Sequence, residues 1–209
     1  MSASVPRPLS DGAMTTYPVR PLYGGAMSAQ IPEGWLDVSD MRQVPSHQEC
    51  WQDPTTGALL VVEILDHQTS VTNDAAAQYF YQDLAEANGV AESDRQFCVL
   101  PANKELTLAG VSSSSSTICL GKGLQKIQQG KEYDAFGNKR DLPEGHWVQI
   151  DLAVIRLPQV TTDMLVTLSS PTPTSPPQAN TQSGETLHSS HLFQTILSSI
   201  HIRDWSLFG

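Results

Sequence analysis

Residues 48–65 read Gln-Glu-Cys-Trp-Gln-Asp-Pro-Thr-Thr-Gly-Ala-Leu-Leu-Val-Val-Glu-Ile-Leu, two β-prone runs joined by a short polar link. The link, Asp53–Gly57, holds the Asp, Pro and Gly residues that favour tight turns, so it predicts a hairpin. Gln48–Gln52 is the expected first strand. Ala58–Leu65 is the expected second, and its apolar composition predicts a central strand that is covered on both faces. An antiparallel pair is therefore the starting point of the fold.

Toward the N-terminus, Tyr23–Ile31 is expected to form a strand entered through Gly24 and Gly25. A turn at Pro32–Gly34 and an irregular stretch, Trp35–Pro45, are expected to follow. Toward the C-terminus, the apolar period changes and predicts a helix over Asn73–Asn88 with Asn73 as its N-cap. The residues expected on the buried face of that helix are Ala76, Tyr79, Phe80, Leu84 and Ala87.

Further β-prone segments follow the helix. Four strands are predicted within Gln96–Leu108, Thr117–Gln128, His146–Leu157 and Asp163–Ser169. The third alternates, with Val148, Ile150, Leu152 and Val154 on one face and Gln149 and Asp151 on the other. A C-terminal helix is expected to start near Ser183, with an apolar stripe at Leu187, Leu192, Phe193, Ile196, Leu197 and Ile200. This order of elements predicts an α+β fold with an antiparallel sheet and helices packed on it.

Composition divides the chain into a tail and one body. Residues 1–20 are rich in Ser, Pro and Thr without apolar periodicity, which predicts a flexible N-terminal tail. Residues 21–209 are expected to form a single domain, because their apolar content supports one packed core. Three polar stretches, near residues 110–116, 130–145 and 171–184, are expected to be loop insertions in that domain.

Negative charge is concentrated in one third of the chain. The net charge is −10, and twelve acids but a single base, Arg42, lie between Glu33 and Asp94. Such a segment predicts either a solvated, solubilising face or a docking surface for a basic partner, and both interpretations remain open at this point. Nucleic acid and anionic membranes are not expected as partners, because they attract clustered Lys and Arg.

Features of several other protein classes are missing from the sequence. No stretch approaches the roughly 20 apolar residues of a membrane-spanning helix. The first residues, Met1–Arg7, lack the apolar core of a secretory signal. The three cysteines, at positions 50, 98 and 119, are odd in number and far apart, so they predict neither a disulfide framework nor a zinc site. We therefore expect a protein of the cytosol or nucleus.

Motifs for bond chemistry are sparse. Gly121-Lys122-Gly123 lacks the spacing of a phosphate loop and stands in an expected strand. His188 and His191 are three residues apart on an expected helix, where ordinary helix residues explain them better than metal ligation. Glu63 and Asp66 flank the end of the strongest apolar strand, either as solvated strand-end charges or as a functional pair. We expect no catalytic residue, cofactor or metal.

Ordered motif blocks run through most of the chain. They are Tyr23-Gly24-Gly25-Ala26, Ile31-Pro32, Asp37–Pro45, Gln48-Glu49, Val62–Asp66, then Tyr79, Phe80, Asp83 and Leu84, then Ile155–Gln159, Thr162–Val166 and Ser206–Gly209. Together these blocks resemble the Ran guanine-nucleotide release factors, the Mog family. The resemblance covers roughly residues 22–209. The chain departs from the family in its N-terminal tail, around Ser112–Ser116, in the insertion Gly130–Gly145 and in the Pro-rich stretch after Pro171.

The resemblance implies a fold and a function. The fold is a single α+β domain, an antiparallel sheet between helices, similar to the PsbP-like sandwich. The function is binding of the small GTPase Ran and release of its guanine nucleotide, without covalent chemistry, in support of nucleocytoplasmic protein transport. A monomer of the nucleus and cytoplasm is expected.

The resemblance also implies that Ran binds near Glu63 and Asp66. We extend that hypothesis to three further acids, Asp37, Asp40 and Glu49, which are expected to pair with Lys and Arg of Ran.

Three other side chains have two possible roles each. Arg42 is expected either to hold its own loop by an internal salt bridge or to reach the partner. Trp35 and Trp51 are candidates for interface anchors or for core residues.

Two other functions stay open. One is an acidic adaptor module that binds another basic protein without exchange activity. The other is a small-molecule-binding or hydrolytic protein on the same fold, which a deep apolar pocket with convergent polar groups would favour and a flat acidic surface would disfavour.

Overall fold

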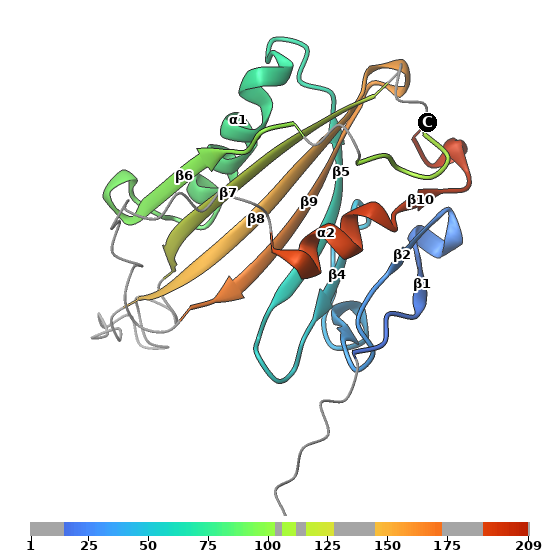
Figure 1. Ribbon diagram of the computed structural model, residues 1–209, viewed down its shortest axis with the longest axis horizontal. Helices are drawn as coiled ribbons and strands as arrows, with labels where there is room; N and C mark the ends of the chain where they lie inside the picture. The colour runs from blue at the N-terminus through green and yellow to red at the C-terminus, as the bar shows by residue number, and fades with distance from the viewer. Residues whose placement is uncertain (1–14, 103–105, 112–115, 128–144, 173–189, 209) are drawn as a thin grey trace, which may run out of the picture.

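The part of the chain that the structure describes, residues 15–102, 106–111, 116–127 and 145–208, folds into two antiparallel sheets and two α-helices (Figure 1). The structure is a computed structural model. The large sheet has the strand order β3-β4-β5-β9-β8-β7-β6, and the small sheet has the order β1-β2-β10. The predicted α+β class, an antiparallel sheet flanked by helices, is therefore confirmed.

The elements have the following bounds. The large sheet consists of β3 (Leu36–Asp37), β4 (Gln48–Gln52), β5 (Leu59–Asp66), β6 (Arg95–Val99), β7 (Thr117–Ile127), β8 (His146–Leu157) and β9 (Thr162–Pro171). The small sheet consists of β1 (Val19–Leu22), β2 (Met27–Gln30) and β10 (His201–Ile202). The helices are α1 (Asn73–Ala87) and α2 (His191–Ser198), with 3-10 turns η1 (Tyr23–Gly25), η2 (Val38–Asp40), η3 (Glu92–Asp94), η4 (Pro158–Val160) and η5 (Trp205–Phe208).

The predicted hairpin is confirmed as β4 and β5. Its turn is closed by the Gly57 N–H, which donates to the Asp53 carbonyl at 2.9 Å. Strand β5 is central, third of the seven strands. Coverage on both faces is wrong, however, because Leu60 and Val62 are buried while Leu59 and Val61 on the other face are only half-buried. Helix α1 leaves that face of β5 open, since it packs on β6, β7 and β8.

The N-terminal prediction is wrong in its details. Tyr23–Gly25 is a 3-10 turn in which all three residues have positive φ, so only Met27–Gln30 of the predicted strand is extended. Val19–Leu22 forms β1, which takes two residues from the predicted tail; residues 1–14 lie outside the described part. The stretch expected to be irregular contains β3 and η2. Strands this short carry too few residues for an apolar period to be recognised.

Both helices are confirmed, with different bounds or faces. Helix α1 has Thr72 rather than Asn73 as its N-cap, and it buries Ala76, Ala77, Phe80, Tyr81 and Ala85. The predicted face had included Tyr79, which is 40% exposed. Helix α2 begins at His191 with Ser190 as its N-cap, not near Ser183; residues 173–189 lie outside the described part.

The large sheet buries a different cluster on each face. The first face packs against α2 and the small sheet through residues such as Leu60, Val62, Ile155 and Phe193, and α2 crosses in front of the sheet in Figure 1. The second face packs against α1. The residues of that second cluster are Ala76, Phe80, Tyr81, Val148, Ile150, Leu152, Val154 and Leu165.

The predicted alternation of β8 is confirmed, because Val148, Ile150, Leu152 and Val154 pack on the α1 side. Asp151 faces the other way and is fully buried under the N-terminus of α2, where it accepts a hydrogen bond from the Ser190 N–H at 3.3 Å. Of the predicted loop insertions, residues 112–115, 130–144 and 173–184 lie outside the described part.

Candidate partner-binding surface

The strand register separates the predicted contact acids onto two faces of the large sheet. Glu63 pairs with Gln48, whereas Glu49 pairs with Val62, and side chains of paired residues lie on the same face. Glu63 therefore lies on the α1 face and Glu49 on the α2 face. Asp37 pairs with Trp51 and shares the face of Glu49. Neighbours along a strand point to opposite faces, so a run of acids in the sequence does not form one patch.

Glu63 lies inside β5 and not at its end, which corrects the sequence prediction. Its side chain is 20% exposed. The Gln48 side-chain amide donates to Glu63 Oε1 at 2.6 Å, and His47 Nε2 lies 3.3 Å from the same oxygen. Neither neighbour was singled out from the sequence, although the antiparallel hairpin register would have paired Gln48 with Glu63.

Asp66 is the last residue of β5 and is exposed. The loop that follows it is fixed by a buried ion pair between Arg156 Nε and Asp163 Oδ1 at 3.2 Å. The Arg156 guanidinium also donates to the carbonyl of Gln68 at 2.7 Å and to the carbonyl of Val71. Asp163 accepts from the Gln68 N–H at 2.9 Å. A buried pair with these extra hydrogen bonds holds the backbone beside Asp66 in one position.

Glu49 is tied to the rest of the protein. Its Oε1 accepts the backbone N–H of Tyr23 at 2.6 Å, which links β4 to the small sheet. Partial burial raises the pKa of the Glu49 carboxyl, the Tyr23 N–H opposes that rise, and the nearby Asp37 carboxylate adds to it.

Tyr23 completes this link. Its hydroxyl lies 2.8 Å from the carbonyl oxygen of Val62 and 3.1 Å from that of His47. Burial raises the pKa of the Tyr23 hydroxyl, and the Glu49 and Glu63 carboxylates raise it further, so the phenol remains a hydrogen-bond donor. The Tyr-Gly-Gly block of the sequence is thus a structural joint between the two sheets.

The segment 36–42 forms the outer edge of the large sheet. The Asp37 carboxylate caps η2 by accepting from the Ser39 N–H at 2.8 Å and from its hydroxyl. Asp40 and Arg42 are exposed. Among the described residues, no carboxylate lies within ion-pair distance of Arg42, so the internal salt bridge is not found there.

Hydrophobic side chains accompany the acids at this edge. Leu36 is 45% exposed and Met41 is 57% exposed. By contrast Trp35 and Trp51 are each 7% exposed and belong to the core on the α2 face, so the core role is the one found of the two expected for them.

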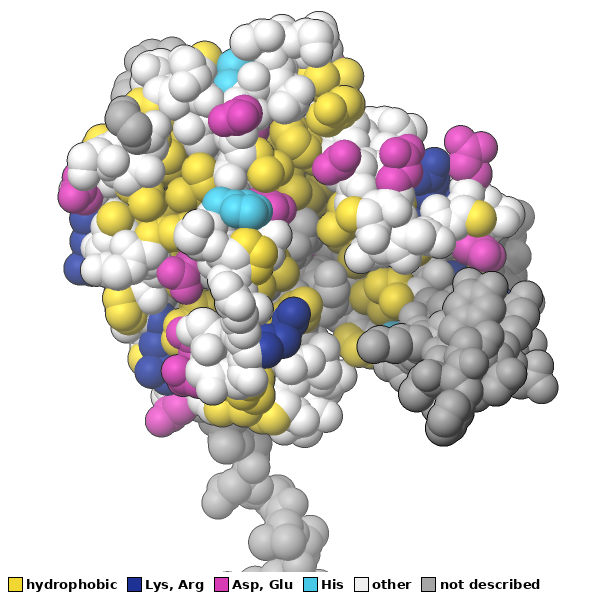
Figure 2. All heavy atoms as spheres, turned by 180° about the vertical axis from the view of Figure 1, so that it is seen from behind, with side chains coloured by type: hydrophobic (Ala, Val, Ile, Leu, Met, Phe, Trp, Pro, Cys, Tyr) yellow, Lys and Arg dark blue, Asp and Glu magenta, His cyan; other side chains and the backbone are white. Residues whose placement is uncertain are grey.

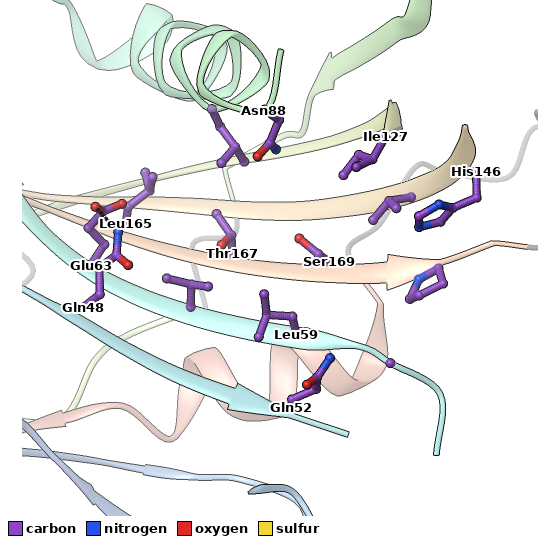
Figure 3. Close-up of a pocket in the computed structure, with 15 residues that line it drawn as sticks. Gln48, Gln52, Leu59, Glu63, Asn88, Ile127, His146, Leu165, Thr167 and Ser169 are labelled. Atoms are coloured by element: carbon purple, nitrogen blue, oxygen red, sulfur yellow. Dashed lines mark hydrogen bonds between the residues drawn. The ribbon is translucent and has the colours of Figure 1, made fainter. Parts of the chain in front are cut away.

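The uncovered part of the α1 face forms a groove of about 320 Å³. Glu63 and Gln48 lie at one end of it, and Ile127 and His146 lie at the other (Figure 3). The face is hollowed beside α1, with hydrophobic side chains exposed in the hollow and acids spread over both flanks (Figure 2). The sequence prediction missed this groove, because it assumed that β5 was covered on both sides.

The groove holds hydroxyls and a histidine but no assembled catalytic group. Among the described residues, no hydrogen bond joins His146 to Thr167 or Ser169, the hydroxyl residues of the groove lining. The described residues also contain no group of three His, Cys, Asp or Glu that could hold a metal ion. The Gly121-Lys122-Gly123 segment lies in β7, as expected, and not in a phosphate loop.

No helix in the described ranges is both long and apolar enough to cross a membrane.

Known proteins are similar to this chain in sequence and in fold. The family model described as Ran-interacting Mog1 protein matches residues 20–171. A Homo sapiens protein called Ran guanine nucleotide release factor is 33% identical over 195 residues, which span 90% of this chain and 95% of the relative. The Saccharomyces cerevisiae nuclear import protein MOG1 is 27% identical over 97% of this chain and 89% of its own length. The crystal structure of the S. cerevisiae Ran-binding protein Mog1p has a TM-score of 0.64 at 21% identity, covering 94% of this chain and 100% of that one.

Proposed function

Because the chain belongs to the Mog1 family of Ran-interacting proteins, we propose that it binds the small GTPase Ran and promotes release of Ran's guanine nucleotide. The single observation that carries this proposal is the family match over residues 20–171, joined by relatives named Ran guanine nucleotide release factor that align over about nine-tenths of this chain. Relatives named nuclear import proteins support a role in nucleocytoplasmic transport and a location in the nucleus and cytoplasm.

Release is a matter of binding and not of covalent chemistry. A protein that binds nucleotide-free Ran more tightly than loaded Ran must weaken nucleotide binding by the same factor. The chain acts as a monomeric binding protein in this scheme, with no cofactor and with neither nucleic acid nor a membrane as partner. A net charge of −10 favours basic protein partners over those two.

The proposed contact residues differ in how free they are to bind. Asp40, Arg42 and Asp66 are exposed, so they can meet Ran directly. Glu63 is accessible from the groove. Glu49 holds the Tyr23 turn, and its contribution to Ran binding is therefore mainly to shape the β4 edge.

Asp37 caps η2 and shares this supporting role. Its half-buried carboxylate still adds negative charge beside Asp40.

Charge reversal tests the proposal. Glu63→Lys combined with Asp66→Lys is expected to weaken binding to nucleotide-free Ran at least a hundredfold, because two attractive contacts become repulsive. The measurement is an affinity determination by calorimetry together with the rate at which Ran releases a labelled nucleotide. Folding is checked by thermal unfolding.

The matched control is Asp83→Lys with Glu86→Lys, which makes the same change in net charge on the exposed side of α1. This control is expected to keep most of the affinity. Equal binding by the site variant and the unmodified chain would refute the site, whereas absence of binding by the unmodified chain would refute the function.

An acidic adaptor without exchange activity is the second candidate. Asp40, which follows β3, and Asp83 and Glu86 on α1 are exposed, and these charges support it. Binding of Ran without any acceleration of nucleotide release would favour this candidate.

A further inference from the structure

The groove on the α1 face presents apolar walls that end at a carboxylate. Leu59 and Val61 from β5 and Leu165 from β9 line its floor, and Leu84 from α1 lines its side. Leu59, Val61 and Leu84 are half-buried. Half-buried apolar side chains gathered in one hollow are typical of a surface that receives another group.

The carboxylate at the end is only partly engaged. Both recorded neighbours of Glu63, the Gln48 amide and His47, contact Oε1. Among the described residues, Glu63 Oε2 has no hydrogen-bond donor. The Gln48 contact fixes the direction of the carboxylate, so the second oxygen is held in place for a donor from outside.

A long cationic side chain satisfies both features. Lys and Arg pack their aliphatic stems along apolar surface and keep the charged head at a polar end. A guanidinium favours two oxygens at once, whereas an ammonium is a point charge that suits a single oxygen. With Oε1 already occupied by the Gln48 amide, the arrangement favours lysine.

We propose that the groove receives a lysine side chain of the partner, its stem on Leu59, Val61 and Leu165 and its ammonium on Glu63 Oε2. This proposal rests on the proposed function, because it takes Ran as the partner. A volume of about 320 Å³ lies at the lower end of the roughly 300–1,000 Å³ range of ligand sites, which suits a side chain better than a larger ligand. Asp66 and Asp37 lie on other parts of the surface, so the groove would add to the Glu63 contact an apolar site that those two acids do not share.

Filling the groove tests the proposal without touching a charge. Val61→Phe puts a larger side chain in the floor of the groove and Leu84→Phe puts one in its side, and both leave Glu63 and Asp66 unchanged. Each is expected to weaken binding to nucleotide-free Ran at least tenfold. Val99→Phe is the matched control, because Val99 is 47% exposed on β6 and does not line the groove. It is expected to bind like the unmodified chain.

Two further measurements test whether the groove is in contact with a lysine of Ran. Methyl NMR spectra of the unmodified chain are expected to show shifts of the Leu59, Val61 and Leu165 methyls when Ran is added, which does not depend on any variant folding. Ran with dimethylated lysines is expected to bind the unmodified chain more weakly than unmethylated Ran does. For Val61→Phe, methylation of Ran is expected to cause no further loss of affinity.

Each contrary result has a separate meaning. Full binding by both filled variants, or no groove methyl shifts, would overturn the lysine proposal and leave the proposed function standing. Insensitivity of the unmodified chain to lysine methylation would overturn it in favour of arginine. Tighter binding by the filled variants would overturn it in favour of a segment of this chain in the groove. Failure of the unmodified chain to bind Ran would overturn the proposed function and this inference together.

Discussion

Glu49 is the residue at which charge and structure are most closely connected. It stands in the acidic third of the sequence, yet its carboxylate holds the backbone of Tyr23 at 2.6 Å. Partial burial is the largest effect on its pKa and raises it. The Tyr23 N–H lowers the pKa by a smaller amount, and the Asp37 carboxylate raises it by the smallest amount. The native protein therefore favours the protonated form of this group more than the unfolded chain does. Ionisation of Glu49 at neutral pH weakens the fold slightly.

Glu49→Gln should reveal this cost, because Gln accepts the same hydrogen bond without a charge. A raised native pKa gives stability that is present at low pH and is lost as the carboxyl ionises. The stability of the variant relative to the unmodified chain is thus expected to increase between about pH 3.5, below the ordinary Glu pKa, and pH 7. The gain should stay below about 1 kcal/mol, since the group is half-exposed and solvent screens it. Urea unfolding at several pH values measures this gain. If the variant instead loses stability relative to the unmodified chain as the pH rises, the pKa of Glu49 is not raised in the folded protein.

Arg156 contributes to stability through a buried ion pair with Asp163. It is 3% exposed, and its partner Asp163 is fully buried. Arg156→Met would keep the volume of the stem but leave Asp163 buried beside His67 without its main cation. The expected loss is about 3–5 kcal/mol in the free energy of unfolding.

Chemical denaturation measures that loss, and a second variant identifies its cause. Arg156→Met with Asp163→Asn removes both charges and should recover a large part of the stability. If the double variant is as unstable as the sum of the two single variants, the residues are not coupled in the way described.

At the residue level, the sequence offered candidate contact residues but not the directions of their side chains. The acidic residues and the Tyr-Gly-Gly block were recognised, but their side-chain directions depend on the pairing of β4 with β5. A shift of one residue in that register would exchange Glu49 and Glu63 between the two faces. Directions of this kind follow from three-dimensional pairing, which a local pattern does not contain.

Strand β7 and helix α1 show the same principle at the level of elements. A Cβ added at Gly121 would lie 2.1 Å from the Phe97 ring, and one at Gly123 would lie 2.4 Å from the Tyr81 ring and 2.7 Å from the Gln96 carbonyl. The Tyr81 and Phe97 rings stack with centroids 4.3 Å apart. The glycines around Lys122 therefore make room for two aromatic rings, which explains why a Gly-Lys-Gly motif stands in a strand.

Gly123→Ala should accordingly destabilise the protein by about 1–3 kcal/mol, because ring and backbone must both move. Thermal or urea unfolding measures the change. Gln96→Ala on the neighbouring strand is the control, since that side chain is exposed and should change stability by less than about 0.5 kcal/mol. A neutral Gly123→Ala variant would mean that α1 is free to shift away from the sheet.

Elements of eight residues or more with a clear period were predictable, namely β5, α1, β7, β8, β9 and the position of α2. The short elements β1, β3 and β10 were not, because two to four residues are too few for an apolar period to be recognised. Strand β10 is held by pairing with β2 and by a bridge between its His201 and Ala109, and both β2 and Ala109 lie far away in the sequence. The open groove was missed for a related reason, since the position of α1 across β6, β7 and β8 is a tertiary property.

At the level of the whole molecule, the main property is its charge. A net charge of −10 produces a field that attracts a basic partner before contact. Because β2 pairs with β10 and both sheets share one hydrophobic cluster, we infer that residues 21–209 fold as one domain. The acids are thus carried on one body and act on an approaching partner together.

Binding kinetics should show this field. The association rate with Ran is expected to fall about tenfold or more between 50 and 300 mM salt, where the screening length shortens from above to below about 10 Å. The dissociation rate should change much less. Stopped-flow fluorescence measures the association and dissociation rates separately. The double variant Asp37→Asn with Asp40→Asn should make the association rate depend less steeply on salt concentration. A salt effect carried by the dissociation rate alone would argue against long-range steering.

The small sheet has a consequence for how the protein is made. Gln30 donates to Ser199, a residue 169 positions away in the chain, and the Arg203 N–H donates to the Ala26 carbonyl at 2.9 Å. A ribosome builds the chain from the N-terminus, so β2 emerges long before β10 can reach it. The pairing of β2 with β10 must then wait until residues 201–202 have left the ribosome. Folding of the small sheet is expected to finish only after β10 has left the ribosome, and until then a chaperone would meet β1 and β2 with one edge of β2 still open.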